Sequence, residues 1–123
     1  MTNADLQFLT VDQLVHRFAD IGVQQDKAEQ AEHDSKYKRL FFEMSDIQEE
    51  LKRRPGDQRR ALVTLLDYPN MQVRLRAAQY ALAVAPEAAR QTIEAIAAST
   101  WPPQCYDARN CLRRLDEGEF VPD

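Results

Sequence analysis

The chain has 123 residues with 16 basic and 20 acidic side chains, so its formal net charge at pH 7 is -4. That length fits one domain whose core is large enough to fold without disulfides or a structural metal. No apolar run reaches the roughly 18 residues needed to cross a membrane, and no basic stretch followed by an apolar run opens the chain, so we expect a cytoplasmic protein.

The balance of residue types favours a helical fold. Glycine occurs only at Gly22, Gly56 and Gly118, alanine is frequent, and strict alternation of apolar and polar residues is missing. These features leave little support for strands, and we predict an all-α protein. Cys105 and Cys111 fall in one predicted helix on different faces, so we expect two reduced thiols.

The first half of the chain is predicted to form two long helices. Thr10 and Gln13 make a capping box for a helix over about residues 11–31. The second helix ends sharply at Arg54-Pro55-Gly56. Its predicted buried stripe consists of Tyr37, Leu40, Phe41, Met44, Ile47 and Leu51.

Charged residues on this second helix are spaced for ion pairs. Glu49 precedes Arg53 by four residues, and Glu50 precedes Arg54 in the same way. Such pairs stabilise a helix slightly when an acid precedes a base by one turn. We interpret them as a solvated face.

The second half is predicted to hold four shorter helices. Asp57 is the expected cap of the first, and Asn70 caps the next after a proline turn. Pro86 stands in the first turn of the third, where proline is tolerated. The last helix follows Trp101-Pro102-Pro103 and ends near Gly118, with a short tail that is expected to pack back.

The stretch from Ala61 to Leu82 resembles one HEAT repeat. Paired leucines, a proline turn, the Val73-Arg74 step, the Ala77-Ala78 pair and a closing leucine stand at the spacing of that family. The resemblance implies a short right-handed α–α superhelix of about three HEAT-like hairpins in a single domain over residues 1–123. The hairpins would span about residues 11–54, 57–84 and 86–117.

Most of the chain also resembles a small bacterial family of HEAT-like proteins of unknown function. The matching segments are Tyr37 to Leu40, Val84 to Ala88, Trp101 to Gln104 and Leu115 to Phe120. Lys38 departs from that pattern, which has a short polar residue there. The resemblance supports the fold and assigns no activity.

The sequence offers no catalytic or cofactor-binding motif. It has no glycine-rich phosphate loop, no Gly-x-Ser-x-Gly and no cysteine close to a histidine, so we expect no enzyme activity and no cofactor. Asp12, His16 and Asp20 repeat at one-turn spacing, which is compatible with a metal contact. An exposed polar helix edge is the favoured interpretation, and we assign no metal site.

Arg74 and Trp101 each have two interpretations. HEAT helices commonly carry an arginine at the position of Arg74 that bonds to loops, so a structural tether is favoured over a partner contact. Trp101 lies between Thr100 and a proline pair. It either packs against the last helix, which we favour slightly, or displays its indole rigidly to a partner.

These features favour a non-enzymatic module that grips a partner protein on the concave face of a helical stack. A bacterial neutralising, immunity or adaptor protein is a concrete version, because an acidic surface suits a basic toxin. The predicted partner-binding residues belong to the fourth helix, the last helix and the loop before it: Gln72, Arg76, Gln79, Trp101, Tyr106, Arg109 and Arg113.

The alternative function is nucleic-acid binding or DNA processing through a basic band. Residues 36–60 carry 8 basic and 5 acidic side chains, whereas the segments on both sides are acidic. We favour a salt-bridged surface for this band and expect no tight nucleic-acid binding at the total charge of -4. An enzyme with an unrecognised carboxylate pair is the third and least favoured class.

Overall fold

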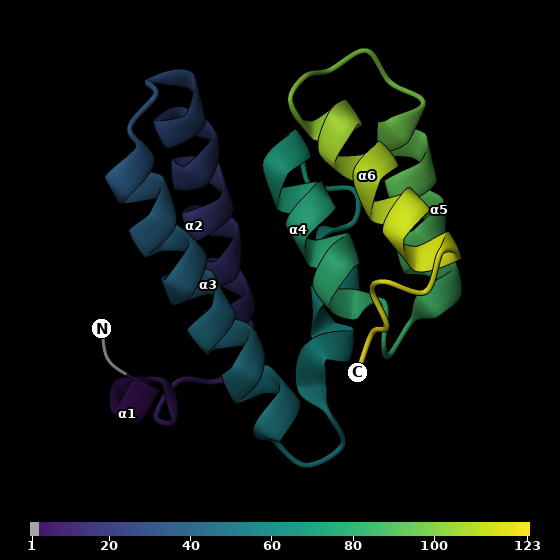
Figure 1. Cartoon of the computed structure of the whole chain (residues 1–123). Coiled ribbons are helices and arrows are strands. Elements are labelled where there is room, and N and C mark those ends of the chain that lie inside the picture. Colours follow the sequence, from purple (N-terminus) through teal and green to yellow (C-terminus); the bar gives the residue numbers. More distant parts are fainter. Residues whose placement is uncertain (1–2) are drawn as a thin grey trace. The chain divides into compact units, whose positions relative to one another are not determined.

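The computed structural model describes residues 3–123, with side chains from Asp5 onward, and no residue of that range lies in a strand. The all-α prediction is therefore confirmed. Figure 1 shows the elements in chain order, α1 (Asn3–Leu6), α2 (Val11–Gln30), α3 (Asp34–Arg53), the 3-10 helix η1 (Gln58–Leu65), α4 (Met71–Ala81), α5 (Pro86–Ala97) and α6 (Gln104–Asp116). The chain groups into two compact units, Met1–Ala61 and Leu62–Asp123.

The first unit is built on a hairpin of α2 and α3, with α1 packed against α3. His33 caps α3, because its Nδ1 accepts a hydrogen bond from the backbone N–H of Lys36 at 3.3 Å. Most large apolar residues at helical spacing on these two helices are buried, namely Leu14, Phe18, Ile21, Leu40, Met44, Ile47 and Leu51, whereas Tyr37 is half-buried.

The prediction that Phe41 belongs to this buried stripe is wrong. Its ring is exposed and meets the exposed ring of Phe42 edge-on, with 5.6 Å between the ring centroids. Leu40 and Met44 occupy the inward face of α3, and a residue one position further along a helix turns about 100° away from such a face.

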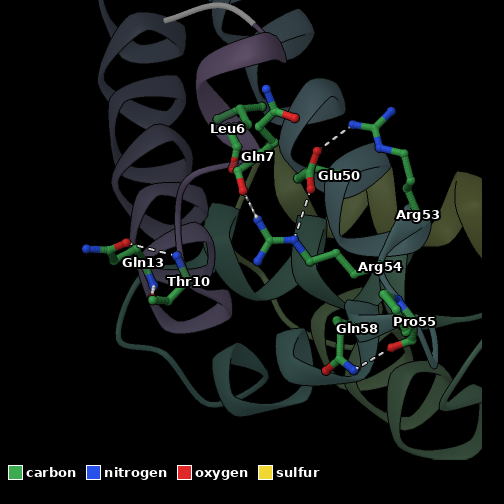
Figure 2. A network of polar contacts seen from close by, with 9 residues as sticks. All are labelled: Leu6, Gln7, Thr10, Gln13, Glu50, Arg53, Arg54, Pro55 and Gln58. Carbon is green, nitrogen blue, oxygen red and sulfur yellow. Dashed lines mark hydrogen bonds and ion pairs between the residues drawn. The ribbon is translucent and has the colours of Figure 1, made fainter.

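The start of α2 follows the sequence prediction. The backbone N–H of Gln13 donates to the Thr10 hydroxyl at 3.1 Å, and the backbone N–H of Thr10 donates to Gln13 Oε1 at 2.9 Å (Figure 2). This reciprocal pair satisfies two backbone donors that the first turn of a helix leaves without partners. The capping box is therefore confirmed, and it fixes where α2 begins.

The helix predicted after Asp57 is present, but Gln58–Leu65 is a 3-10 helix rather than an α-helix. Asp57 caps it as predicted, because its Oδ1 accepts a hydrogen bond from the backbone N–H of Arg59 at 3.3 Å, although its φ of 51° differs from the extended backbone of most caps. The same carboxylate also accepts two hydrogen bonds from the Arg59 guanidinium, at 2.9 and 2.7 Å. The tighter 3-10 winding fits the short segment between the turns at Gly56 and Pro69.

The second unit consists of α4, α5 and α6 packed against one another. Asn70 caps α4, since its Oδ1 accepts the backbone N–H of Val73 at 3.1 Å, and Pro86 opens α5. Phe120 packs back onto the core, as expected for the tail. The buried core residues are small or branched, namely Leu75, Ala78, Ala81, Leu82, Ala89, Ile93, Ile96, Ala108 and Cys111. The HEAT-like superhelix and the single-domain organisation stay predictions.

Candidate partner-binding surface

Two exposed aromatic rings lie at the N-terminal end of α6. Trp101, in the loop before the helix, is 61% exposed, and Tyr106, in its first turn, is 63% exposed. The guanidinium carbon of Arg109 lies 5.4 Å from the centroid of the Tyr106 ring, within the range of a cation–π contact. We call Trp101, Tyr106 and Arg109 the aromatic platform.

Hydrogen bonds to the α5–α6 loop hold the arginine of the platform in place. Arg109 donates from Nε to the carbonyl of Ala97 at 2.8 Å and from Nη2 to the carbonyl of Ser99 at 3.2 Å. The Ser99 hydroxyl donates to the Ile96 carbonyl at 2.6 Å and accepts the backbone N–H of Trp101 at 3.3 Å. The loop that displays the indole is therefore held both by the Ser99 hydroxyl within it and by Arg109 of α6.

The charge of Arg109 is not neutralised within the described part of the chain. Its hydrogen bonds go to two backbone carbonyls, and no carboxylate among residues 5–123 forms an ion pair with it. Carbonyl dipoles orient a guanidinium without cancelling its charge. The platform thus combines two apolar faces with one positive charge.

The favoured interpretation of Trp101 as a core residue is wrong. The core positions at this end of α6 are taken by Cys105 and Ala108, which are both buried. Pro102 precedes Pro103, which stands at the N-cap of α6, and the indole remains outside the packed interface. Of the two interpretations of the sequence, the displayed indole is the one that agrees with this exposure.

Gln72 does not lie on an exposed line of α4, and that part of the prediction is wrong. Its side chain is 2% exposed, and its Oε1 accepts a hydrogen bond from Nε2 of the equally buried Gln104 at 2.9 Å. A buried amide needs such a partner, because an unsatisfied one is costly. The pair therefore joins α4 to the start of α6 in a structural role.

The remaining predicted residues are less available than the platform. Arg76 and Gln79 are half-buried, and Arg76 Nη1 donates to Gln79 Oε1 at 2.7 Å. Arg113 is exposed, but it bonds to Glu117 at 2.6 Å and to Asn110 at 2.9 Å. Its charge is compensated, unlike that of Arg109.

Arg74 behaves as the structural tether that the sequence favoured. Its Nε donates to the backbone carbonyl of Tyr68, in the turn between η1 and α4. Asn70 in the same turn caps α4, so a side chain on the helix and a side chain in the turn fix the same junction.

The predicted Glu50–Arg54 ion pair at the end of α3 is confirmed, but its burial and the second arginine that joins it were not predicted. Glu50 is 5% exposed rather than solvated, and it accepts hydrogen bonds from both Arg53 and Arg54 (Figure 2). Arg53 therefore pairs with Glu50 and not, as predicted, with Glu49. The hydrogen bond from Arg53, reinforced by that from Arg54, lowers the pKa of Glu50 below its ordinary value.

The same network anchors α1, which the sequence analysis did not predict. Arg54 Nη2 donates to the backbone carbonyl of Leu6 at 3.1 Å, and the Leu6 side chain is buried (Figure 2). Leu9 directly precedes the Thr10 cap, and an apolar residue at that position is a known signal of packing against the helix, whereas Leu6 lies four residues before the cap.

The described residues contain no group of three or more His, Cys, Asp or Glu side chains arranged to hold a metal ion. His16 Nε2 lies 3.5 Å from Asp20 Oδ2 on an exposed edge of α2. Cys105 and Cys111 are both free and buried, and burial raises the pKa of the Cys111 thiol. Within residues 3–123, no helix has the length and apolar character required to span a membrane.

The chain is similar to one solved structure over almost its whole length. The crystal structure of the protein RPA1889 from Rhodopseudomonas palustris CGA009 shares 51% sequence identity and a TM-score of 0.94, covering 96% of this chain and 98% of that chain. No curated protein matches the chain. The family model described as a domain of unknown function, DUF2019, matches residues 12–116. The predicted membership of a family of unknown function is confirmed, whereas the HEAT relationship stays a prediction: the chain belongs to the DUF2019 family.

Proposed function

We propose that the protein is a non-enzymatic module that binds another protein through the aromatic platform. The observation that carries this proposal is the exposure of two rings, Trp101 and Tyr106, at the start of α6, together with the fixed and uncompensated charge of Arg109 against the Tyr106 ring. Tryptophan, tyrosine and arginine are the residue types most enriched at binding hot spots.

The geometry suits a hot spot because little side-chain freedom remains to be lost on binding. Arg109 is already held by two carbonyls, and the loop carrying Trp101 is tied down at Ser99. Ordering a flexible side chain at an interface costs about 0.5–1.5 kcal/mol, and preorganisation avoids part of that cost. A partner that places a carboxylate near Arg109 and an apolar group on the rings would match the platform.

The nucleic-acid alternative receives less support than the protein partner. Three guanidiniums of the basic band are engaged inside the first unit, Arg53 and Arg54 with Glu50 and Arg59 with Asp57. Phosphate binding draws on cations that are available to the ligand. These ion pairs therefore favour the interpretation of residues 36–60 as a salt-bridged surface.

The finer parts of the proposal extend the sequence prediction. We place the protein in the cytoplasm of a bacterium, as a HEAT-like stack with a neutralising, immunity or adaptor role. Two observations support this role. The net charge of -4 suits a basic partner that contacts acidic residues outside the platform, and the platform itself is exposed.

A capture experiment tests the proposed function. Tagged wild type, Trp101→Ala, Arg109→Ala and the control Glu94→Ala, an exposed residue on α5, are used as baits in a lysate of the source cells. We expect wild type and the control to capture one protein partner. Each platform variant should capture about tenfold less of it or still less, as hot-spot truncations do. Thermal melting checks that all four baits are folded.

Two outcomes would contradict the proposal. Retention of the partner by both platform variants would remove the platform from binding. Loss of capture after nuclease treatment of the lysate would show that nucleic acid, rather than a protein surface, holds the complex together.

A further inference from the structure

The first unit contains a groove that the aromatic platform does not include. It has a volume of about 560 Å³ and is lined by side chains of α2 and α3, with Leu6 and Leu9 contributing from the segment before α2. Ligand pockets in proteins commonly have volumes of about 300–1,000 Å³. We call it the α2–α3 groove.

The inner lining of the groove is apolar. Ile21 of α2 and Leu40 and Ile47 of α3 line it and are buried, and Leu9 is half-buried. Because Ile21, Leu40 and Ile47 are already almost fully buried, the apolar surface left for a ligand belongs chiefly to Leu9, and covering it contributes roughly 25 cal/mol per Å². The groove thus favours a ligand with aliphatic parts.

The outer lining carries more negative than positive charge. Its carboxylates come from both long helices and are Asp12, Asp20, Glu43 and Asp46. Its guanidiniums are Arg17 and Arg39, and His16 is counted as neutral at pH 7. Arg39 lies 3.8 Å from Glu43 and offsets its charge. Because these carboxylates outnumber the guanidiniums, the lining carries a surplus of negative charge.

We propose that the α2–α3 groove binds a segment of a partner protein that carries arginine or lysine side chains. These side chains combine an aliphatic stem with a charged head, so the stem covers the apolar lining while the head reaches a carboxylate. The charge surplus and the apolar lining together favour such a segment over an acidic or a purely apolar one. This inference rests on the proposed protein-binding function and adds the chemistry of one partner segment.

The test measures binding of a defined probe to the full chain. A short fluorescein-labelled peptide of arginine, leucine and alanine is titrated with wild type, with Asp12→Asn/Asp20→Asn, and with the matched control Glu29→Gln/Glu32→Gln. The control removes the same number of charges from exposed residues outside the groove. The same peptide with glutamine in place of arginine tests whether the charge of the ligand matters.

We expect the arginine peptide to bind wild type and the control alike, and to bind Asp12→Asn/Asp20→Asn about fivefold more weakly, which corresponds to two partly exposed charge contacts. Binding should weaken as salt rises, and the glutamine peptide should bind poorly. Chemical-shift changes on wild type should fall on Ile21, Leu40 and their neighbours rather than on Tyr106.

Several results would overturn the inference. The first is that the arginine peptide shows no saturable binding to wild type. The second is that it binds Asp12→Asn/Asp20→Asn as tightly as the control variant, or that the glutamine peptide binds wild type as tightly as the arginine peptide. The third is that spermine binds wild type as tightly as the arginine peptide, which would assign the groove to a small polyamine. Self-association that is lost in Asp12→Asn/Asp20→Asn would assign it to a second copy of the chain. None of these results alters capture by the platform in lysate, so failure here is distinct from failure of the proposed function.

Discussion

Arg53 and Arg54 both bond to Glu50, but only Arg54 also reaches α1. Replacing each by methionine keeps an unbranched stem and removes the guanidinium. Arg54→Met deletes the donor to Glu50 at 2.9 Å and the donor to the Leu6 carbonyl at 3.1 Å. Arg53→Met deletes one bond from a side chain that is 61% exposed, against 19% for Arg54. The two variants therefore form a matched pair.

The expected loss for Arg54→Met follows from these contacts. A hydrogen bond to a charged group contributes about 1.5–3 kcal/mol. Since Glu50 keeps Arg53 and the Leu6 carbonyl keeps the backbone N–H of Leu9, no buried group loses its last partner, and we expect a loss of about 1.5–3 kcal/mol in the unfolding free energy. Arg53→Met should cost clearly less, because its guanidinium is solvated.

Urea denaturation of the two variants measures this difference, and hydrogen exchange locates it. The amides of Phe8 and Leu9, which donate to Asp5 and Leu6, should exchange faster in Arg54→Met than in Arg53→Met. Equal destabilisation by the two variants, with unchanged exchange at Phe8 and Leu9, would refute the role given to the Leu6 bond.

Two further predictions concern titration and thiol chemistry. Because its ion pairs lower the pKa of Glu50, they stabilise the fold above the unfolded value of about 4.3, and this contribution is lost as pH falls through the lower folded value. Glu50→Gln should therefore be less stable at pH 7 and lose less stability on acidification; a parallel acid limb in urea melts at successive pH values would contradict this. Cys105 and Cys111 are buried and burial raises the pKa of the Cys111 thiol, so the native protein should react slowly with a thiol reagent at pH 7 and rapidly in urea. Complete reaction of both thiols within the mixing time, without denaturant, would show that this end of α6 opens readily.

Features that depend on neighbours in the sequence were predictable. The capping box of Thr10 and Gln13, the Asn70 cap and Pro86 at the start of α5 each involve groups within one helical turn. Such contacts form wherever the residue types recur at the right spacing. They located the ends of the helices well, although they did not distinguish a 3-10 helix at Gln58–Leu65.

Features that depend on distant residues were not predictable from spacing. Gln72 occupies a helix position that looks exposed, yet it is buried because Gln104, 32 residues away, pairs with it. Glu50 looks like a solvated acid, yet it joins a network that reaches Leu6, which bonds to Arg54 across 48 residues. Charge and amide pairing of this kind depends on the packing of whole elements.

The platform was predictable only where its contacts are between neighbours in one helix. Tyr106 and Arg109 stand three apart in one helix, which places them on a common face, and their cation–π contact follows from that spacing. The exposure of Trp101 did not follow, because composition alone gives an indole both a core role and a binding role.

The attachment of α1 bears on the order in which the first unit folds. The α2–α3 hairpin joins helices that are adjacent in the chain, whereas α1 meets the far end of α3 through a bond that closes a loop of 48 residues. The entropy cost of closing a loop grows with the logarithm of its length, and a helix of four residues has little stability alone. We therefore expect the hairpin to form first and α1 to dock on Arg54 last, and we expect α1 to be the first element of this unit to detach.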